Sequence, residues 1–314
     1  MAGSRSVSVV IATYNRAGLL AETLQAIARQ TMPPQEVIII DDGSTDHTAE
    51  VAKGAGGEVR YERIANQGPQ AARGHGVTLA SGELIAVVDD DDLWLPEKLA
   101  LQHEAMQRSG CPWVYGDAMA FDDHSGKDLY RFSEVSQPHS GRVRDALLQV
   151  NFIPSPTVLI ERALLLRVQS RAAALDLRFG EDWLTWLLAA DEAPVARVEQ
   201  VVARYRIHPG GAASRTSVEQ RLRDSEQVLD FCATVFDRSA RGAIAKARGL
   251  ARLKAAVGMV SERRPLQGMG FALGALVRRP WLLVEAPLTG ARMGRHLLGA
   301  KFRTLRQAEA KPPG

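Results

Sequence analysis

The stretch GELIAVVDDDDLWLPEKL, residues 82–99, carries an apolar run into four consecutive aspartates and then into a proline. The run Leu84–Val88 has the uninterrupted aliphatic pattern of a strand that is buried on both faces. Pro96 is placed to open a helix, which the sequence predicts over 97–109. A buried strand, a polar turn and a helix therefore form the unit from which this fold is predicted.

The same unit occurs three times upstream of this stretch. Apolar runs predict strands over residues 7–12, 36–40 and 59–64, and helical patterns follow over 19–30, 48–54 and 67–80. Further along the chain, the sequence predicts strands over 113–121 and 157–160 and a helix over 182–190. Strands that alternate with helices indicate βαβ units, so we expect an α/β fold with a mostly parallel central sheet flanked by helices.

Charge divides the chain into two regions. The 314 residues carry 39 Lys and Arg against 36 Asp and Glu, and 46% are hydrophobic, a composition typical of a globular protein. From Ala240 onward there are 15 basic and 3 acidic residues, whereas the first 239 residues are acidic overall. The acidic region could hold cations, and the basic region could meet phosphates or an anionic membrane surface.

Motifs that the sequence lacks argue against several function classes. G-x-G-x-x-G does not follow the first strand, and the motifs of phosphate-loop NTPases, elbow-type hydrolases and zinc proteases do not occur. The basic region lacks interleaved aromatic residues, so we expect no nucleic-acid partner. Cys111 and Cys232 are too few for a disulfide framework and suit a reducing compartment. Without a secretory leader or a spanning apolar run, the expected location is cytoplasmic.

The four aspartates Asp89–Asp92 are the strongest chemical signal in the sequence. Adjacent carboxylates repel one another, and a divalent cation relieves that repulsion. Magnesium and manganese bind a few carboxylates together with the phosphate oxygens of a substrate. The sequence therefore predicts a metal site at the end of this strand, and the alternative is a solvated acidic turn that caps the next helix.

Polar residues also follow the first two predicted strands. Thr13, Tyr14 and Arg16 follow the first, where a ring could stack on a planar base and a guanidinium could pair with phosphate. Asp41 and Asp42 end the second, where a carboxylate could accept hydrogen bonds from a base or a sugar. Because the carboxyl ends of parallel strands meet at one edge, we expect one site there. The alternative for the first segment is an ordinary helix start, and the alternative for the second is an Asp-Gly turn without a ligand.

Two later segments carry further titratable groups. Glu181 and Asp182 precede an apolar helix and lie beside Trp183, so a carboxylate there could act as a general base with a raised pKa. The alternative for this pair is a helix N-terminal cap. His208 precedes a glycine-rich loop and is either a structural or solvated histidine or a ligand near a metal and a diphosphate.

Six segments, in order and at compatible spacing, resemble the family 2 glycosyltransferases, inverting enzymes with the GT-A fold. The segments are VSVVIATYNR (7–16), EVIIIDDGSTD (36–46), NQGPQAARGHGV (66–77), GELIAVVDDDDLWLPEKL (82–99), GEDWLTWLL (180–188) and YRIHPGGAAS (205–214). The resemblance implies a catalytic domain over 1–215, with a nucleotide-binding half of about 1–116 and an acceptor half of about 117–215. The basic helical region 216–314 would follow it.

The resemblance implies a nucleotide site at the ends of the first strands. Thr13, Tyr14 and Arg16 match the segment that holds the nucleotide in this family. Asp42 matches the aspartate that bonds the uracil or thymine ring. Arg73 matches an arginine near the base and the phosphates. The implied donor is a nucleotide-diphosphate sugar, with a UDP-sugar favoured.

The first three aspartates, Asp89-Asp90-Asp91, match the D-x-D motif of the family. Asp89 and Asp90 are the candidates for bonding the ribose of the donor. Asp91 matches the ligand of the divalent metal, manganese or magnesium, that bridges the diphosphate. His208 matches a histidine in a loop over the diphosphate and is the second implied metal ligand.

The pair Glu181-Asp182 matches the E-D motif of the family, which supplies the implied chemistry. Asp182 matches the catalytic base, and Glu181 and Trp183 fall on the acceptor side. The segment NFIPSP (151–156), which contains Ser155, matches an acceptor-side loop. The implied reaction moves a sugar to the hydroxyl of a glycan, lipid-linked or other acceptor with inversion, in the assembly of a polysaccharide or glycolipid of the cell envelope. A non-catalytic nucleotide-sugar or glycan-binding protein on the same fold and a nucleotidyltransferase are the alternatives.

The basic residues of 240–314 surround apolar stripes, a pattern typical of amphipathic helices that lie on an anionic membrane. Two interpretations follow from it. Either this region contacts the inner face of the membrane peripherally, or its helices pack on the catalytic domain and turn their basic faces to water.

Overall fold

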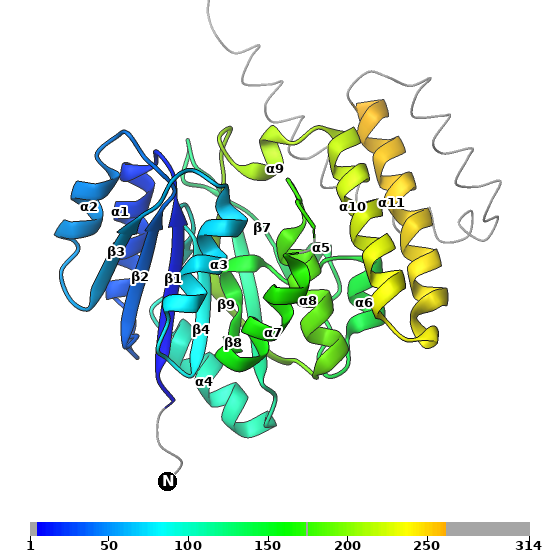
Figure 1. The fold of residues 1–314 in the computed structure, drawn as a ribbon, viewed down its shortest axis with the longest axis horizontal. Coiled ribbons are helices and arrows are strands. Elements are labelled where there is room, and N and C mark those ends of the chain that lie inside the picture. Colours follow the sequence, from blue (N-terminus) through cyan, green and yellow to red (C-terminus); the bar gives the residue numbers. More distant parts are fainter. Residues whose placement is uncertain (1–4, 174, 262–314) are drawn as a thin grey trace, which may run out of the picture. The chain divides into compact units, whose positions relative to one another are not determined.

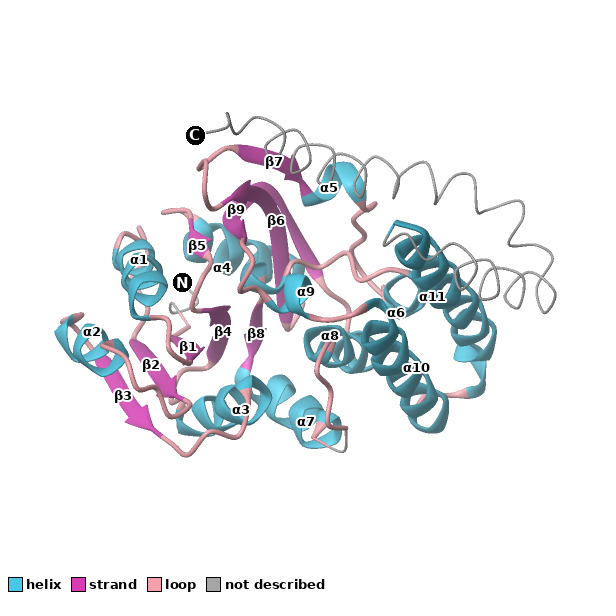
Figure 2. Cartoon of the chain, turned by 90° about the horizontal axis from the view of Figure 1, so that it is seen from above, coloured by secondary structure: helices cyan, strands magenta, loops and turns pink. Residues whose placement is uncertain are grey.

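The computed structural model describes residues 5–173 and 175–261, and the chain divides into two compact units, residues 1–215 and 216–314 (Figure 1). The first unit is built on a nine-stranded sheet with the order β3-β2-β1-β4-β8-β6-β9-β5, and β7 pairs with β6. Figure 2 shows this sheet with helices along it. The α/β fold class with a central sheet flanked by helices is therefore confirmed.

The first four strands of the predicted βαβ units form a parallel block. β1 (Val7–Thr13) lies between β2 (Glu36–Asp41) and β4 (Leu84–Asp89), and β3 (Val59–Arg63) pairs with β2. The apolar side chains of β1 and β2 are almost completely buried because helices cover both faces of these strands. The continuous apolar runs of the sequence follow directly from this double burial.

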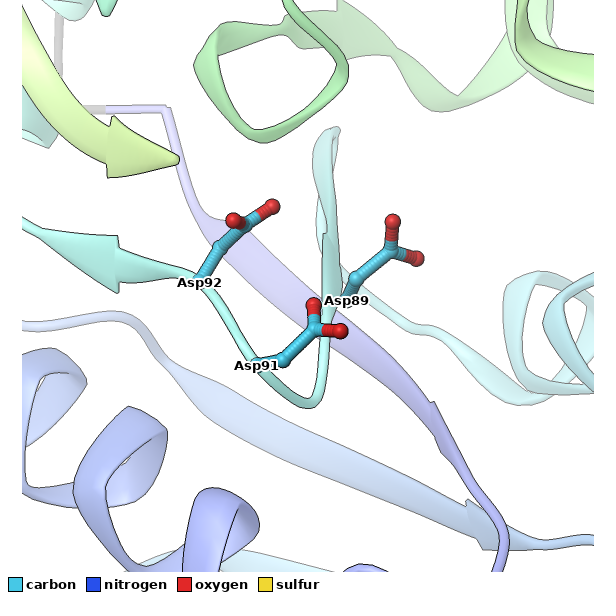
Figure 3. A group of neighbouring side chains, drawn as sticks. All are labelled: Asp89, Asp91 and Asp92. Atoms are coloured by element: carbon cyan, nitrogen blue, oxygen red, sulfur yellow. The ribbon is translucent and has the colours of Figure 1, made fainter. Parts of the chain in front are cut away.

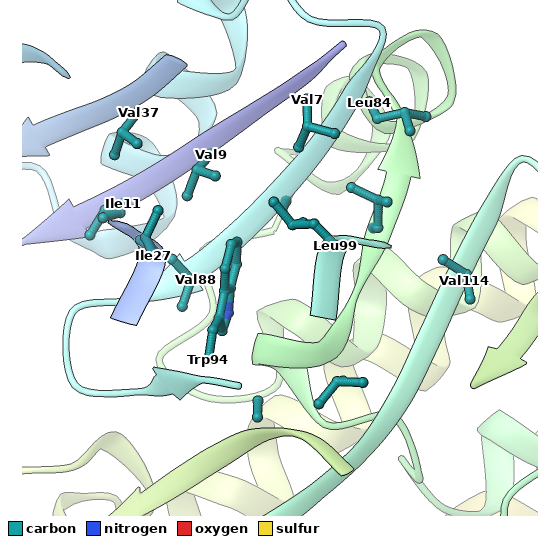
Figure 4. Close-up of a cluster of buried hydrophobic side chains, with 14 of the residues drawn as sticks. Val7, Val9, Ile11, Ile27, Val37, Leu84, Val88, Trp94, Leu99 and Val114 are labelled. Atoms are coloured by element: carbon teal, nitrogen blue, oxygen red, sulfur yellow. The ribbon is translucent and has the colours of Figure 1, made fainter. Parts of the chain in front are cut away.

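α1 (Ala17–Ala28) and α4 (Lys98–Ser109) pack on the sheet face that carries the odd-numbered side chains of β1. Figure 4 shows Ile27 of α1 and Leu99 of α4 in the same core as Val9. The helical patterns predicted over 19–30 and 97–109 correspond to these two helices.

α3 (Pro69–Leu79) covers the opposite face and approaches the sheet closely at Gly76. A Cβ atom placed on Gly76 would lie 2.5 Å from Val10 Cγ1 and 3.1 Å from Ile40 Cγ1. A Cβ atom on Gly74, two residues earlier in the same helix, would have nothing within 4 Å.

We therefore expect opposite effects from the same substitution at these two glycines. Gly76→Ala should lower the free energy of unfolding by about 1–3 kcal/mol, because the added methyl group overpacks the helix against the sheet. Gly74→Ala should raise it by about 0.5–1 kcal/mol through helix propensity alone. Urea denaturation of both variants measures the difference, and equal stabilisation by the two would contradict the close approach at Gly76.

Beyond the parallel block the sheet becomes mixed. β8 (Leu159–Glu161) is antiparallel to both β4 and β6 (Trp113–Asp122). The strand predicted over 157–160 is wrong at its start, because residues Ser155–Thr157 form the 3-10 turn η1, with Pro156 inside it. Proline fixes φ and removes a backbone donor, so the ladder begins only after this turn.

β9 (Ala196–Ile207) is a twelve-residue strand that the sequence analysis does not predict. It runs parallel to β6, and the register between the two strands shifts near Tyr115 and Asp117. These irregularities, together with charged residues at both odd and even positions of β9, break the regular alternation by which a strand is identified in a sequence. The remaining elements of the first unit are α2 (Thr48–Gly54), β5 (Leu93–Trp94), β7 (Asp128–Arg131), α5 (Phe132–Val135), α6 (Arg144–Gln149), α7 (Arg162–Ala172), α8 (Glu181–Glu192) and α9 (Ala212–Arg215).

The described part of the second unit is helical, with α10 (Val218–Val235), the 3-10 turn η2 (Arg238–Ala240) and α11 (Arg241–Ser261). Within the described ranges, 5–173 and 175–261, no helix combines the length and apolar character needed to cross a bilayer.

Ion pairs join the two helices of the second unit. Arg248 lies 2.6 Å from Asp230, and Arg252 lies 2.9 Å from Glu226. Part of the basic charge of α11 is therefore balanced by carboxylates of α10. Residues 262–314, which carry most of the basic charge expected to meet a membrane, lie outside the described residues.

Candidate functional site

The polar turns after β1, β2 and β4 lie at one edge of the sheet. Thr13 is in register with Asp41, and Ala12 is in register with Asp89, so the three strands end at nearly the same level. The backbone N–H of Asp42 donates to the carbonyl of Thr13 at 2.9 Å, which extends this edge by one residue. The structure thus brings these turns together.

The acidic turn, residues Asp89–Asp92, gathers carboxylates at this edge. One carboxylate oxygen from each of Asp89, Asp91 and Asp92 lies within 4.8 Å of the others (Figure 3). Asp92 is only 1% exposed, and its Oδ1 accepts the backbone N–H of Arg206 at 3.1 Å. Its Oδ2 is buried and has no partner among the described residues. A buried carboxylate oxygen without a partner favours a bound cation or donor at this place.

Arg16 neutralises part of the acidic turn from the start of α1. Its Nη1 donates to Asp90 Oδ1 and to Asp91 Oδ2, both at 2.8 Å. Burial raises the pKa of Asp90 to about 6, and the guanidinium of Arg16 opposes that rise. Nη2 of Arg16 donates to the carbonyl of Gly210 at 2.7 Å, so one side chain ties the acidic turn to the glycine-rich loop.

His208 opens that loop and reaches the same carboxylate. Its Nε2 lies 2.9 Å from Asp91 Oδ2, and its side chain is 9% exposed. The carbonyl of His208 accepts the backbone N–H of Gly211 at 3.2 Å, which closes a tight turn. The two residues predicted to bind metal, Asp91 and His208, are therefore in direct contact.

This donor set fits a hard divalent cation. The carboxylates of Asp89, Asp91 and Asp92 are the ligand type that magnesium and manganese prefer, and the imidazole of His208 lies beside them. The unpartnered Oδ2 of Asp92 is one acceptor that such an ion would satisfy. These side chains do not fill the coordination shell of such an ion, so phosphate oxygens of a ligand could complete it.

Arg206 is a site residue to which the sequence analysis assigns no role. Its side chain is 5% exposed, and its Nε donates to the backbone carbonyl of Asp91 at 2.8 Å. Its two terminal nitrogens donate to Asp123 at 2.5 Å and to Glu22 at 2.6 Å. The sequence shows an arginine two residues before His208, but sequence separation does not predict which groups it contacts.

Arg73, on α3, links the acidic turn to the E-D segment. Its Nη1 donates to Glu181 Oε2 at 2.9 Å, and its Nη2 donates to Asp89 Oδ1. Burial raises the pKa of Glu181, and the charge of Arg73 opposes that rise. The nucleotide-binding and acceptor segments implied by the sequence thus share one guanidinium.

Asp182 lies in the first turn of α8, after Gly180, whose φ of 84° lies in the left-handed region that favours glycine. Its Oδ1 accepts the backbone N–H of Trp183 at 2.7 Å, and its Oδ2 accepts the amide of Asn151 at 3.3 Å. Burial raises the pKa of the Asp182 carboxyl above that of an ordinary aspartate, and the charge of Asp89 adds to the rise. A carboxylate with a raised pKa is better suited to accept a proton near neutral pH.

The remaining nucleotide-site candidates occupy different positions on the same edge. Asp42 is 3% exposed, and its two oxygens accept the backbone N–H groups of Gln67 and Gly68, both at 2.8 Å. Asp42 therefore holds the loop before α3. Tyr14 is 48% exposed, so its ring is accessible, whereas Thr13 is buried.

The candidates for the acceptor side come from α8 and from the turn η1. Trp183 turns its indole N–H to the carbonyl of Leu147 at 2.7 Å, which anchors α8 to α6. Ser155 begins η1 and lies in the loop that follows Asn151. Of this loop, Asn151 rather than Ser155 reaches Asp182. The resemblance places the segment 151–156 on the acceptor side but gives Asn151 no role of its own.

The comparison with protein families agrees with the fold. Residues 8–167, half of the chain, match the family described as Glycosyl transferase family 2. The chain belongs to this family, as the sequence motifs implied.

Curated relatives share the same part of the chain. An "Uncharacterized glycosyltransferase" of Rickettsia felis is 31% identical over 206 residues, which cover 65% of this chain and 33% of that protein. The Bacillus subtilis protein described as "Putative teichuronic acid biosynthesis glycosyltransferase TuaG" is 29% identical over 213 residues, which cover 64% of this chain and 79% of the relative. The matched region spans only about a third of the length of the rickettsial relatives.

A solved structure shares the fold. S. aureus TarS 1–349, determined in complex with UDP-GlcNAc, superposes with a TM-score of 0.55 at 17% identity. The match covers 86% of this chain and 89% of that chain. It confirms the GT-A type of fold that the sequence motifs implied.

Proposed function

We propose that this chain transfers a sugar from a nucleotide-diphosphate donor to an acceptor hydroxyl. The observation that carries the proposal is the bridge made by Arg73, which joins Asp89 of the acidic turn to Glu181, the neighbour of Asp182. Arg73 therefore connects the acidic turn, which would bind the cation, to the segment of Asp182, whose pKa is raised by burial. Membership of the family supports the same reaction class.

We assign the donor nucleotide to the ends of β1, β2 and β4. The accessible ring of Tyr14 would stack on the base, and Asp42 would accept from the base edge. Arg16 and Arg73, which now pair with carboxylates, would also face the phosphates. A UDP-sugar is favoured by the sequence motifs and by the fold shared with TarS, whose structure contains UDP-GlcNAc.

The acidic turn would complete the donor site. Asp89 and Asp90 are assigned to the ribose, and Asp91 and His208 to a divalent cation, manganese or magnesium. When bound, this cation would balance the charge of the diphosphate leaving group. Arg206 would keep the backbone of Asp91 in place during the reaction.

Asp182 would act as the base. It would take the proton of the acceptor hydroxyl as the acceptor oxygen bonds to the anomeric carbon of the sugar. The bond from that carbon to the diphosphate oxygen breaks in the same displacement, and the electron pair leaves with the diphosphate. A single displacement inverts the anomeric carbon, so no second carboxylate nucleophile is required.

Thermal stability in the presence of nucleotides tests the donor site. UDP, GDP, dTDP and CDP are each added with and without manganese. A ligand that binds only the native state raises the midpoint temperature of unfolding. At a ligand concentration 100 times the dissociation constant, it adds about 2.7 kcal/mol to the free energy of unfolding. We expect a manganese-dependent rise with UDP, and no rise with any nucleotide would overturn the donor-site assignment.

The products of the reaction distinguish the alternatives. Release of UDP with transfer of the sugar is the expected result. Release of pyrophosphate would identify a nucleotidyltransferase instead. Manganese-dependent UDP binding without turnover of any UDP-sugar would identify a non-catalytic nucleotide-sugar-binding protein.

The acceptor that we propose is a glycan or a lipid-linked hydroxyl in polysaccharide assembly. The family and the name of the Bacillus subtilis relative support this class. We further propose that the enzyme works in the cytoplasm and that residues 240–314 contact an anionic membrane surface. Co-sedimentation with vesicles of anionic lipid at low salt should recover the protein in the pellet, and vesicles of neutral lipid should not. A protein that stays in the supernatant with both would overturn the membrane contact.

A further inference from the structure

The carboxylate of Asp182 receives a side-chain hydrogen bond from a loop 31 positions earlier in the sequence. Nδ2 of Asn151 lies 3.3 Å from Asp182 Oδ2. In the part of the chain that the structure describes, the other donor to this carboxylate is the backbone N–H of Trp183, which bonds to Oδ1. Each oxygen of Asp182 is therefore held by a different donor.

The backbone of the loop determines which end of the Asn151 amide faces Asp182. The N–H of Ile153 donates to Asn151 Oδ1 at 3.3 Å. An amide side chain has one acceptor end and one donor end, so this bond turns the NH₂ group toward the carboxylate. A flipped amide would place two oxygens against each other at Asp182 and two N–H donors against each other at Ile153.

The loop that carries Asn151 is fixed to the core. Phe152 and Ile153 are 3% and 2% exposed. Thr157 donates to the carbonyl of Pro154 twice, through its backbone N–H at 3.0 Å and through its hydroxyl at 2.7 Å. The carbonyl of Thr157 in turn accepts the amide of Gln102 from α4. The position of Asn151 is therefore set by buried contacts at the other end of its loop.

Gln102 is itself oriented by a buried lysine. Lys98 is completely buried, and its Nζ donates to Gln102 Oε1 at 2.7 Å. The same Nζ lies 4.0 Å from the centre of the Trp94 ring. Burial lowers the pKa of Lys98 well below its usual value. This relay of Lys98, Gln102 and Thr157 connects the helix after the acidic turn to the loop of Asn151.

We propose that Asn151 is a positioning residue that orients the carboxylate of Asp182 toward the acceptor hydroxyl. The inference rests on the proposed function, in which Asp182 is the base. It adds a role for a residue outside the E-D motif, and it gives the loop 151–157 a task in catalysis. The hydrogen bonds from Lys98 through Gln102 to Thr157 anchor that loop, and therefore the residue that contacts the base.

The titratable and charged groups that face Asp182 come from four elements, one of which is Tyr205 on β9, and Asn151 is neutral. Asp89 on β4 and Glu181 on α8 are acidic, and Arg73 on α3 is basic. A donated hydrogen bond stabilises the charged form of a carboxylate, so the amide of Asn151 lowers the pKa of Asp182 against the effect of burial. Removing the amide leaves the three charged residues in place.

The test compares wild-type enzyme with Asn151→Ala and Asn151→Asp. In Asn151→Ala we expect kcat to fall about tenfold with the KM for the donor within about twofold, because a hydrogen bond to a charged group is lost only at the base. The acidic limb of the kcat profile should move up by about one pH unit. Asn151→Asp keeps the acceptor for Ile153 but replaces the donor with a second carboxylate, so its limb should move further.

Carbon-13 NMR of the aspartate carboxyls gives a readout that does not depend on turnover. The resonance of Asp182 is the one missing from Asp182→Asn. Its titration should move up in Asn151→Ala and further in Asn151→Asp. Unchanged titration and unchanged kcat in an active enzyme would overturn the role of Asn151 alone. Absence of transfer by the wild-type enzyme with every donor would overturn the proposed function, while the carbon titration would still report whether the amide acts on Asp182.

Discussion

Asp182→Asn is expected to abolish transfer while leaving the donor site intact. An amide cannot accept the proton of the acceptor hydroxyl, and loss of a general base lowers kcat by about 10²–10⁴-fold. Asn is nearly isosteric with Asp and can still accept the backbone N–H of Trp183 through its oxygen. Steady-state transfer measures the loss, and the rise in midpoint temperature with UDP and manganese should stay within about 1 °C of wild type.

A matched control lies in the same helix. Asp191 is near the other end of α8, where it pairs with Arg144 at 2.9 Å. Asp191→Asn removes one carboxylate from α8 without touching the acidic turn, so its kcat should stay within about twofold of wild type. Equal loss of kcat in the two variants would show that the helix, and not the base, had been damaged.

The pH dependence of the wild-type enzyme follows from the same residue. Burial raises the pKa of Asp182, so its base form is lost at a higher pH than for an aspartate in water, about 3.9. The profile of kcat should therefore fall on the acidic side with an apparent pKa above that value. An acidic limb at or below it would remove Asp182 from the role of base.

Asp91→Asn is expected to remove the effect of manganese on nucleotide binding. Asp91 is the carboxylate on which Arg16 and His208 converge, so its charge is central to the predicted cation site. A metal ion contributes several kcal/mol to holding a diphosphate, and losing an anionic ligand weakens its binding. We therefore expect the affinity for UDP in the presence of manganese to fall about 100-fold. Isothermal titration with UDP, with and without manganese, measures it.

Asp128→Asn is the control for that variant. Asp128 is an exposed carboxylate of β7 that pairs with Arg204 at 2.7 Å. Its removal changes the net charge by the same amount and should leave UDP binding unchanged. If both variants bind UDP with wild-type affinity in manganese, the acidic turn is not the cation site.

The parallel block of the sheet could be predicted because its signals are local. Each of β1, β2 and β4 is a short apolar run with a polar turn at its end, and burial on both faces makes the run continuous. β9 could not be predicted in the same way. Its pairing with β6 is non-local and shifted in register, so the burial of its residues alternates irregularly.

In the candidate site too, local motifs could be predicted from the sequence and non-local contacts could not. The acidic turn and the E-D segment are contiguous motifs, so their chemistry is visible in the sequence. The contacts of Arg206 with Asp91 and of Asn151 with Asp182 span 115 and 31 positions. Such partners are chosen by the folded geometry of the sheet and loops. No local pattern marks them.

The three contacts of the Arg206 side chain also set an order of events while the chain is being synthesised. Its partners lie at positions 22, 91 and 123, so the backbone of Asp91 gains this anchor only when residue 206 joins them. Closing such long loops is entropically costly and comes late in folding. A nascent chain that has left the ribosome as far as residue 167 already holds the whole segment that marks its family. The contact of Arg206 with Asp91, in contrast, can form only about forty residues later in synthesis, a few seconds at about 5–20 residues per second.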